Sequence, residues 1–130
     1  MKRLLADRQP WYGMPSYERL KAWQLAYQLD LTLYHVTDGF PRDERFGLTS
    51  QIRRAAFSVV ANIAEGAAKR GRREFRRFLD IALGSITEIE VALRIARDRQ
   101  YIPRERWTEV ERQRNHAGVV LWKLYAAMKD

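Results

Sequence analysis

Apolar residues recur every three or four positions along four stretches of the chain, and this spacing predicts four amphipathic helices. The predicted helices span residues 17–37, 48–68, 72–100 and 104–128. No stretch alternates apolar and polar residues for long, so we expect no strand. Because short connections join the four helices, the pattern predicts an all-α, antiparallel up-and-down four-helix bundle.

Each predicted helix carries an apolar stripe that we expect to face the core. Gly84, on the third helix, is expected to let another helix approach closely. The same helix is expected to form two ion pairs at a spacing of four residues, Glu90 with Arg94 and Arg94 with Asp98. In chain order, the four stripes are Leu20, Trp23, Tyr27, Leu31 and Tyr34; Leu48, Ile52, Ala55, Val59, Ile63 and Ala67; Phe75, Leu79, Ala82, Ile86, Ile89, Leu93 and Ala96; and Trp107, Val110, Arg114, Ala117, Leu121, Leu124 and Met128.

The beginning of the chain differs from the rest. Residues 1–15 contain two prolines and show no helical period, which predicts an N-terminal arm before a bundle domain of residues 16–130. A chain of 130 residues suits one such domain. We find neither the apolar core of a signal peptide nor a run long enough to cross a membrane, so we expect a cytoplasmic location without membrane contact.

The chain carries a net positive charge of +8, because Lys and Arg number 24 whereas Asp and Glu number 16. Residues 69–77 hold six basic side chains and one acidic one, so five of the eight net positive charges lie between the second and third helices. This density suits phosphate groups, and positive charge at the start of a helix opposes the helix dipole unless an anion binds there. The alternative is an ordinary solvated helix start. The predicted nucleic-acid-binding residues are Lys69, Arg70, Arg72, Arg73, Arg76 and Arg77.

A polar stripe runs along the second helix beside its apolar stripe. The residue spacings of three and four place its members on one face, and their side chains suit specific hydrogen bonds. The stripe is either an ordinary exposed face or a hydrogen-bonded seam, within the bundle or between subunits, with Glu88 as a partner for Arg54. Its members are Gln51, Arg54, Ser58, Asn62 and Glu65.

Residues that would support catalysis or metal binding are scarce. The chain has no cysteine, and its two histidines, His35 and His116, belong to different helices without a metal-binding motif. The glycines at 66 and 71 have the spacing of a phosphate loop, but Arg72 and Arg73 follow where that motif needs Lys and Ser or Thr. We therefore expect no enzyme activity, no catalytic residue, no metal, no cofactor and no small-molecule substrate.

Three sequence segments stand out: residues 46–56, residues 58–66, and a third segment that contains Glu74, Phe75, Phe78 and Leu79 followed by residues 82–85 and Glu88. Together they resemble the four-helix-bundle family of 23S rRNA intervening-sequence proteins. The resemblance covers roughly residues 17–128. One departure is Val59-Val60, where the family usually has Ile-Pro, and the arginine density at 69–77 is another.

The resemblance implies an up-and-down four-helix bundle, a ring-shaped homopentamer and no known catalysis, with association to ribosomal RNA suggested by genomic position. A structurally similar relative, the accessory variability protein of diversity-generating retroelements, forms a basic pentamer that binds a reverse transcriptase and nucleic acid. Residues that match the family motif are assigned to bundle and subunit contacts, which leaves the arginines at 69–77 for ligand binding. The matching residues are Gln51, Arg53, Arg54, Asn62, Glu65, Ser85 and Glu88.

Together these features predict a non-catalytic oligomer that binds RNA or an RNA–DNA hybrid through phosphates, with weak sequence preference. The alternative is an accessory variability protein of a diversity-generating retroelement, a basic scaffold that binds a reverse transcriptase and its template RNA or cDNA.

Overall fold

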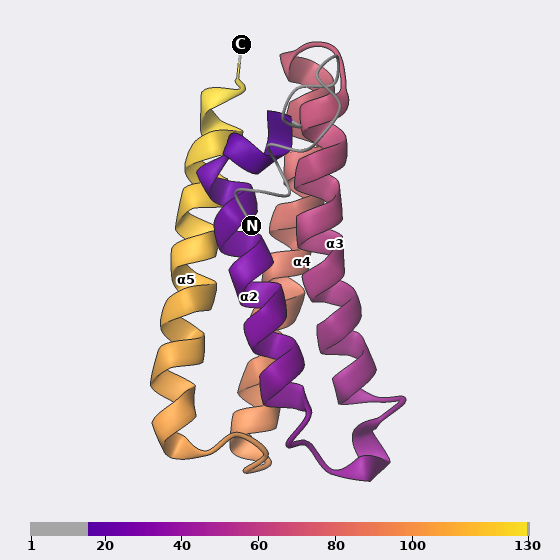
Figure 1. Cartoon of the computed structure of the whole chain (residues 1–130), viewed down its shortest axis with the longest axis vertical. Helices are drawn as coiled ribbons and strands as arrows, with labels where there is room; N and C mark the ends of the chain where they lie inside the picture. Colours follow the sequence, from indigo (N-terminus) through magenta and orange to yellow (C-terminus); the bar gives the residue numbers. More distant parts are fainter. Residues whose placement is uncertain (1–15, 130) are drawn as a thin grey trace, which may run out of the picture.

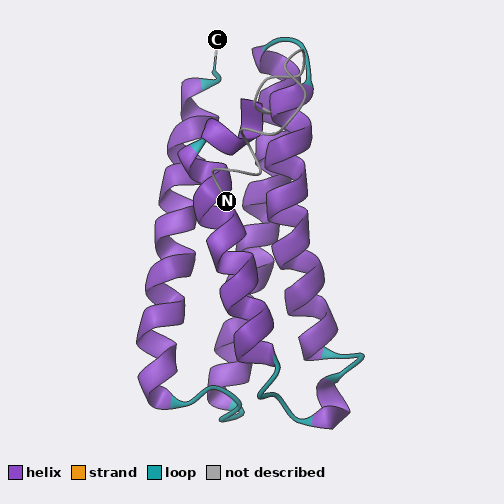
Figure 2. Cartoon of the chain, viewed as in Figure 1, coloured by secondary structure: helices purple, strands orange, loops and turns teal. Residues whose placement is uncertain are grey.

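Four long α-helices make up most of the molecule. A computed structural model of the chain describes residues 16–129, so the arm predicted for residues 1–15 lies outside the described residues. The part that the structure describes contains no strand (Figure 2). The elements are a 3-10 helix η1 (Ser16–Arg19), α2 (Lys21–Thr37), a 3-10 helix η2 (Arg42–Glu44), α3 (Leu48–Ala68), α4 (Arg72–Asp98) and α5 (Arg104–Ala127).

The helices run alternately down and up around a common core (Figure 1). The connections after α2 and α4 lie at the lower pole in that view, and the connection from α3 to α4 lies at the upper pole with the end of α5. This arrangement confirms the predicted all-α four-helix bundle. The helix bounds agree with the prediction within two residues, except that the expected first helix begins as η1 and continues as α2.

The predicted stripes of α3, α4 and α5 face the core. Ile52, Val59 and Ile63 of α3 are fully buried, and so are Leu79, Ile89 and Leu93 of α4. Five stripe side chains near the helix ends are partly buried and pack against this core: Leu48, Phe75, Trp107, Leu124 and Met128. The spacing of apolar residues was therefore sufficient to orient these three helices.

The predicted stripe of α2 was wrong in its second half. Leu31 and Tyr34 are about half exposed. Leu20 and Trp23 are partly buried and pack against the core. The sequence of α2 has apolar residues on nearly every side, so periodicity alone did not decide which face turns inward, and the small alanines allow close packing. The residues that α2 buries are Ala22, Ala26, Leu29, Leu33, Val36 and Thr37.

Close approach of α3 and α4 depends on Gly66, and the expectation for Gly84 was wrong within this chain. A Cβ atom at Gly66 would lie 2.8 Å from the Cβ of Phe78 and 2.9 Å from the Phe75 ring. A Cβ atom at Gly84 would meet nothing within 4 Å. Gly66 therefore fixes how closely the end of α3 packs on the start of α4.

These two glycines give a matched pair of stability predictions. Gly66→Ala should lower the free energy of unfolding by about 1–2 kcal/mol, because overpacking outweighs the better helix propensity of alanine. Gly84→Ala should raise it by about 0.5–1 kcal/mol, since only the propensity changes there. Urea unfolding of both variants at one protein concentration measures the difference, and stabilisation by both substitutions would contradict the close packing at Gly66.

A series of hydrogen bonds links the connection between α2 and α3 to the connection between α4 and α5 at the lower pole. Glu44 accepts a hydrogen bond from the backbone N–H of Leu48 at 3.0 Å, in the first turn of α3, and another from the Tyr101 hydroxyl at 2.9 Å. Arg99 donates to the same hydroxyl at 2.8 Å. The bond from Leu48, followed by that from Tyr101, holds the pKa of the Glu44 carboxyl below its ordinary value. Glu44 thus fastens the start of α3 to the connection between α4 and α5.

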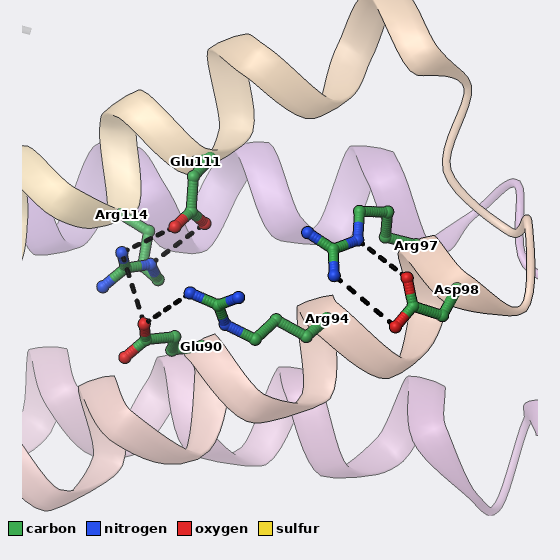
Figure 3. Close-up of polar contacts among 6 residues, drawn as sticks. All are labelled: Glu90, Arg94, Arg97, Asp98, Glu111 and Arg114. Carbon is green, nitrogen blue, oxygen red and sulfur yellow. Dashed lines mark hydrogen bonds and ion pairs between the residues drawn. The ribbon is translucent and has the colours of Figure 1, made fainter.

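Charged residues also lie between α4 and α5 (Figure 3). Arg114 is only 8% exposed, although it carries a charge, and it donates to Glu111 at 2.8 and 3.2 Å. The Arg114 guanidinium lies 3.9 Å from Glu90 of α4, which also pairs with Arg94 at 3.3 Å. The expected pair of Glu90 and Arg94 is therefore confirmed. A carboxylate from each of the two helices offsets the free-energy cost of burying the Arg114 charge.

The second expected pair on α4, Arg94 with Asp98, makes no direct contact: the hydrogen bond from Arg97 lowers the pKa of Asp98 most, and the Arg94 charge adds only a weaker attraction. Asp98 pairs with the adjacent Arg97 at 2.9 Å instead of with Arg94. The Arg97 guanidinium lies 4.9 Å from the ring centroid of Trp107 on α5. Arg94 is engaged by Glu90 one turn earlier, so its guanidinium points away from Asp98 (Figure 3).

Candidate nucleic-acid interface

The predicted basic residues lie at the turn between α3 and α4. Gly71 precedes α4 with a φ of 87°, a left-handed conformation that favours glycine, and it closes a turn of three residues. Because Phe78, Leu79 and Ala82 occupy the inner face of α4, the arginines at the start of that helix face outward. All six basic residues are exposed or half-buried, and we call this set the basic junction: Lys69, Arg70, Arg72, Arg73, Arg76 and Arg77.

Three of these arginines share one surface hollow. The hollow has a volume of about 260 Å³. Arg77 donates to Glu74 at 3.2 and 3.3 Å, and this bond, with the charges of Lys69 and Arg73, holds the pKa of the Glu74 carboxyl below its ordinary value. Glu74 thus stays ionised and neutralises only part of the basic charge. The hollow is lined by Arg73, Glu74, Arg76, Arg77, Asp80 and Tyr125.

Three junction arginines make no direct side-chain contact with an opposite charge among the described residues. The side chains of Arg70, Arg73 and Arg76 form no hydrogen bond or ion pair within residues 16–129. The first turn of α4 has no side-chain cap, so its backbone N–H groups add positive potential beside the arginines. These features give the junction the electrostatic character of an anion-binding surface.

The end of α5 joins the junction, which sequence reasoning missed. Arg72 donates to the carbonyl of Ala127 at 3.3 Å, and Tyr125 lines the hollow. Lys129 lies 5.6 Å from the ring centroid of Trp122 and 5.8 Å from that of Tyr125. The available signal was the antiparallel order of the helices, because it places the end of α5 beside the start of α4.

The predicted polar seam divides into an inner and an outer part. Ser85 is buried and donates to the Ser58 hydroxyl at 2.8 Å, across the contact of α3 and α4. Asn62 donates to the Ser58 carbonyl at 2.8 Å and to its hydroxyl at 3.1 Å. Ser58, Asn62 and Ser85 therefore form a hydrogen-bonded link within the bundle.

The outer part of the seam is exposed. Arg54 and Glu88 form no ion pair with each other among residues 16–129. Gln51 and Glu88 line a hollow of about 360 Å³ between α3 and α4, beside Leu48, Val91 and Ile95. Glu65 is exposed on the same helix as Gln51 and Arg54.

Arg53 connects α3 to the end of α2. Its guanidinium donates to the Thr37 hydroxyl at 2.9 Å, to the Tyr34 carbonyl at 3.3 Å and to the Asp38 carboxylate at 2.8 Å. A cation at the C-terminal end of a helix is favourable, because the last carbonyls lack helical partners. Arg53 is therefore placed to hold α2 and α3 together.

No helix in the described part of the chain is long and apolar enough to cross a membrane. Residues 16–129 contain no group of three or more His, Cys, Asp or Glu side chains that is placed to hold a metal ion.

The bundle and its junction define a class, that of basic, all-α four-helix-bundle proteins. The family model described as the 23S rRNA-intervening sequence protein matches residues 18–123. The chain therefore belongs to the family of 23S rRNA-intervening sequence proteins, as its sequence segments predicted.

A solved structure from Bacteroides thetaiotaomicron shares the fold. It is described as a protein with unknown function from the S23 ribosomal protein family. The two chains are 22% identical, the match covers 80% of this chain and 97% of that one, and the TM-score is 0.71. No curated protein matches the chain.

Proposed function

We propose that this chain is a non-catalytic, oligomeric protein that binds RNA, or an RNA–DNA hybrid, through the phosphates that reach its basic junction. The main observation in support of this proposal is that Arg73, Arg76 and Arg77 line one hollow at the upper pole of the bundle. Two carboxylates, those of Glu74 and Asp80, line the same hollow, so the positive charge is in excess. Membership of a family described by the 23S rRNA intervening sequence supports RNA as the ligand.

Salt dependence tests this proposal. We expect the affinity for a duplex RNA of mixed sequence to fall about 10²- to 10³-fold between 50 and 200 mM salt, because about four to six phosphate contacts would each release counterions. A second duplex of scrambled sequence should bind with closely similar affinity, since phosphates carry no sequence information. Fluorescence anisotropy measures both quantities. Binding that does not respond to salt would contradict phosphate recognition.

The proposed oligomer is a homopentamer whose subunits meet at the hollow between α3 and α4. Val91 and Ile95 are about half exposed there, beside the polar groups of Gln51 and Glu88. An apolar patch with a polar rim is typical of a protein interface. Light scattering should give about five times the chain mass of 15.4 kDa, and Val91→Glu should lower that value. A monomer mass for the unaltered protein would contradict the oligomer.

The alternative, an accessory variability protein that scaffolds a reverse transcriptase, stays a prediction. A reverse-transcriptase gene beside the gene for this chain would favour it, whereas a location inside an rRNA gene would favour direct RNA binding.

A further inference from the structure

A second basic surface, rich in aromatic rings, lies away from the junction. It is a hollow of about 450 Å³ formed by α2, α3 and the connection between them. Phe46 is 87% exposed, Phe57 is 64% exposed and Tyr34 is 45% exposed. Single exposed apolar residues are common, but three aromatic rings around one hollow indicate a binding surface. We call this surface the aromatic groove, which is lined by Tyr34, Arg45, Phe46, Thr49, Ser50, Arg53, Arg54 and Phe57.

Arginines in the groove lie over its rings. The Arg53 guanidinium is 4.6 Å from the ring centroid of Tyr34, and its bonds to Thr37 and Asp38 hold it there. The Arg45 guanidinium lies 5.3 Å from the ring centroid of Phe46. These pairs present flat faces of alternating aromatic and cationic character, to which another planar group can add by stacking.

All the charged side chains that line the groove are positive. Three arginines line it and no carboxylate does. Asp38 neutralises Arg53 from outside the groove, whereas Arg45 and Arg54 form no ion pair within residues 16–129. The Thr49 and Ser50 side chains add hydroxyl groups to the lining. An occupant must therefore combine a planar apolar part with negative charge.

Unpaired nucleotides have this combination, since their bases stack on aromatic rings and their phosphates meet arginines. We propose that the aromatic groove binds single-stranded nucleic acid, with bases stacked on Phe46 and Phe57 and phosphates at Arg45 and Arg54. A volume of about 450 Å³ lies within the range of small-ligand sites. Bases inside a duplex are stacked on one another, so a duplex cannot use these rings.

The groove and the junction are separate sites on one molecule. The groove residues that α3 contributes lie in its first half, and the junction follows its last residue. The whole helix of 21 residues is about 30 Å long. The inference rests on the proposed function, because it adds recognition of unpaired bases to phosphate binding. An RNA with a duplex and a single-stranded tail would engage both sites.

The test compares two labelled probes, a blunt duplex RNA and a single-stranded RNA of mixed sequence, by fluorescence anisotropy with the full chain. Phe46→Ala combined with Phe57→Ala should weaken single-strand binding about 30-fold and duplex binding less than about twofold. The matched control combines Leu31→Ala with Val119→Ala, two exposed apolar residues outside the groove lining. We expect the control to bind both probes as the unaltered protein does. A Phe57→Trp variant should keep single-strand affinity, because a larger ring still stacks.

Two outcomes would overturn the groove proposal. One is unchanged single-strand affinity in the double phenylalanine variant. The other is equal loss for both probes with a lower mass by light scattering, which would make the groove a contact between copies of the chain. Failure of the proposed function has a different signature, namely the absence of salt-dependent duplex binding by the unaltered protein. Single-strand binding that depends on Phe46 and Phe57 would support the groove even then.

Discussion

Replacing Arg70, Arg73 and Arg76 together by glutamine is expected to weaken binding to duplex RNA roughly 100-fold at about 100 mM salt. Each side chain would lose one phosphate contact, and the slope of log affinity against log salt should fall by about 3. None of the three side chains forms a hydrogen bond or ion pair within residues 16–129, so the fold should lose little stability. Fluorescence anisotropy across a salt series measures both effects.

A control with the same change in net charge separates local contacts from the general field. Arg42, Arg104 and Arg112 are exposed and belong to other elements, and their side chains also form no hydrogen bond or ion pair among the described residues. Their joint replacement by glutamine should reduce affinity less than about threefold, because screening weakens charges farther than about 10 Å at 0.1 M salt. Equal losses in the two variants would show that net charge, and not the junction, holds the RNA.

Periodicity predicted this fold well where a helix has one clear apolar face. On α3, α4 and α5 it located the core side chains, including Arg114 as a charged residue on an inner face. It failed on α2, where apolar residues surround the helix and only packing decides that Leu33 is buried and Leu31 is exposed. The sequence also led us to expect close helix approach at Gly84, whereas it occurs at Gly66. Close approach depends on where two helices cross, and the presence of a glycine does not reveal that position.

In the candidate sites, too, some residues could be found from the sequence and others only from the fold. The basic junction is contiguous in sequence, so its charge density was visible without a structure. Tyr125 reaches the junction from a helix that ends about fifty residues later, and only the antiparallel arrangement brings it there. The aromatic groove gathers Tyr34, Phe46 and Phe57 from two helices and a connection. Their spacing follows no motif, so their exposure was the signal, and exposure required the fold.

Arg114 presents the largest expected effect on stability. Its guanidinium is buried between α4 and α5, donates to Glu111 and lies 3.9 Å from Glu90 (Figure 3). The hydrogen bond to Glu111 raises the pKa of Arg114, so the side chain stays charged at all ordinary pH values. Arg114→Ala removes this charge and the packing of its stem, and it leaves the Glu111 carboxylate without its hydrogen-bonded ion-pair partner. Loss of one partner of a buried pair costs about 3–5 kcal/mol. Both carboxylates retain some contact with water, so we expect about 3 kcal/mol here.

Thermal unfolding at one protein concentration should show this loss as a Tm about 10 °C lower, given the entropy of unfolding of a chain of this size. Arg94→Ala is the matched control, because Arg94 pairs with the same Glu90 from an exposed position and should cost less than about 1 kcal/mol.

Arg114→Met combined with Glu111→Met should be more stable than Arg114→Met alone, since removing both charges leaves no unpaired carboxylate at this position. If the double variant were instead the less stable of the two, the cost would lie in lost packing and not in an unpaired charge. Arg114 joins α4 and α5, the two helices whose upper ends supply Arg73, Arg76 and Tyr125 to the hollow at the basic junction.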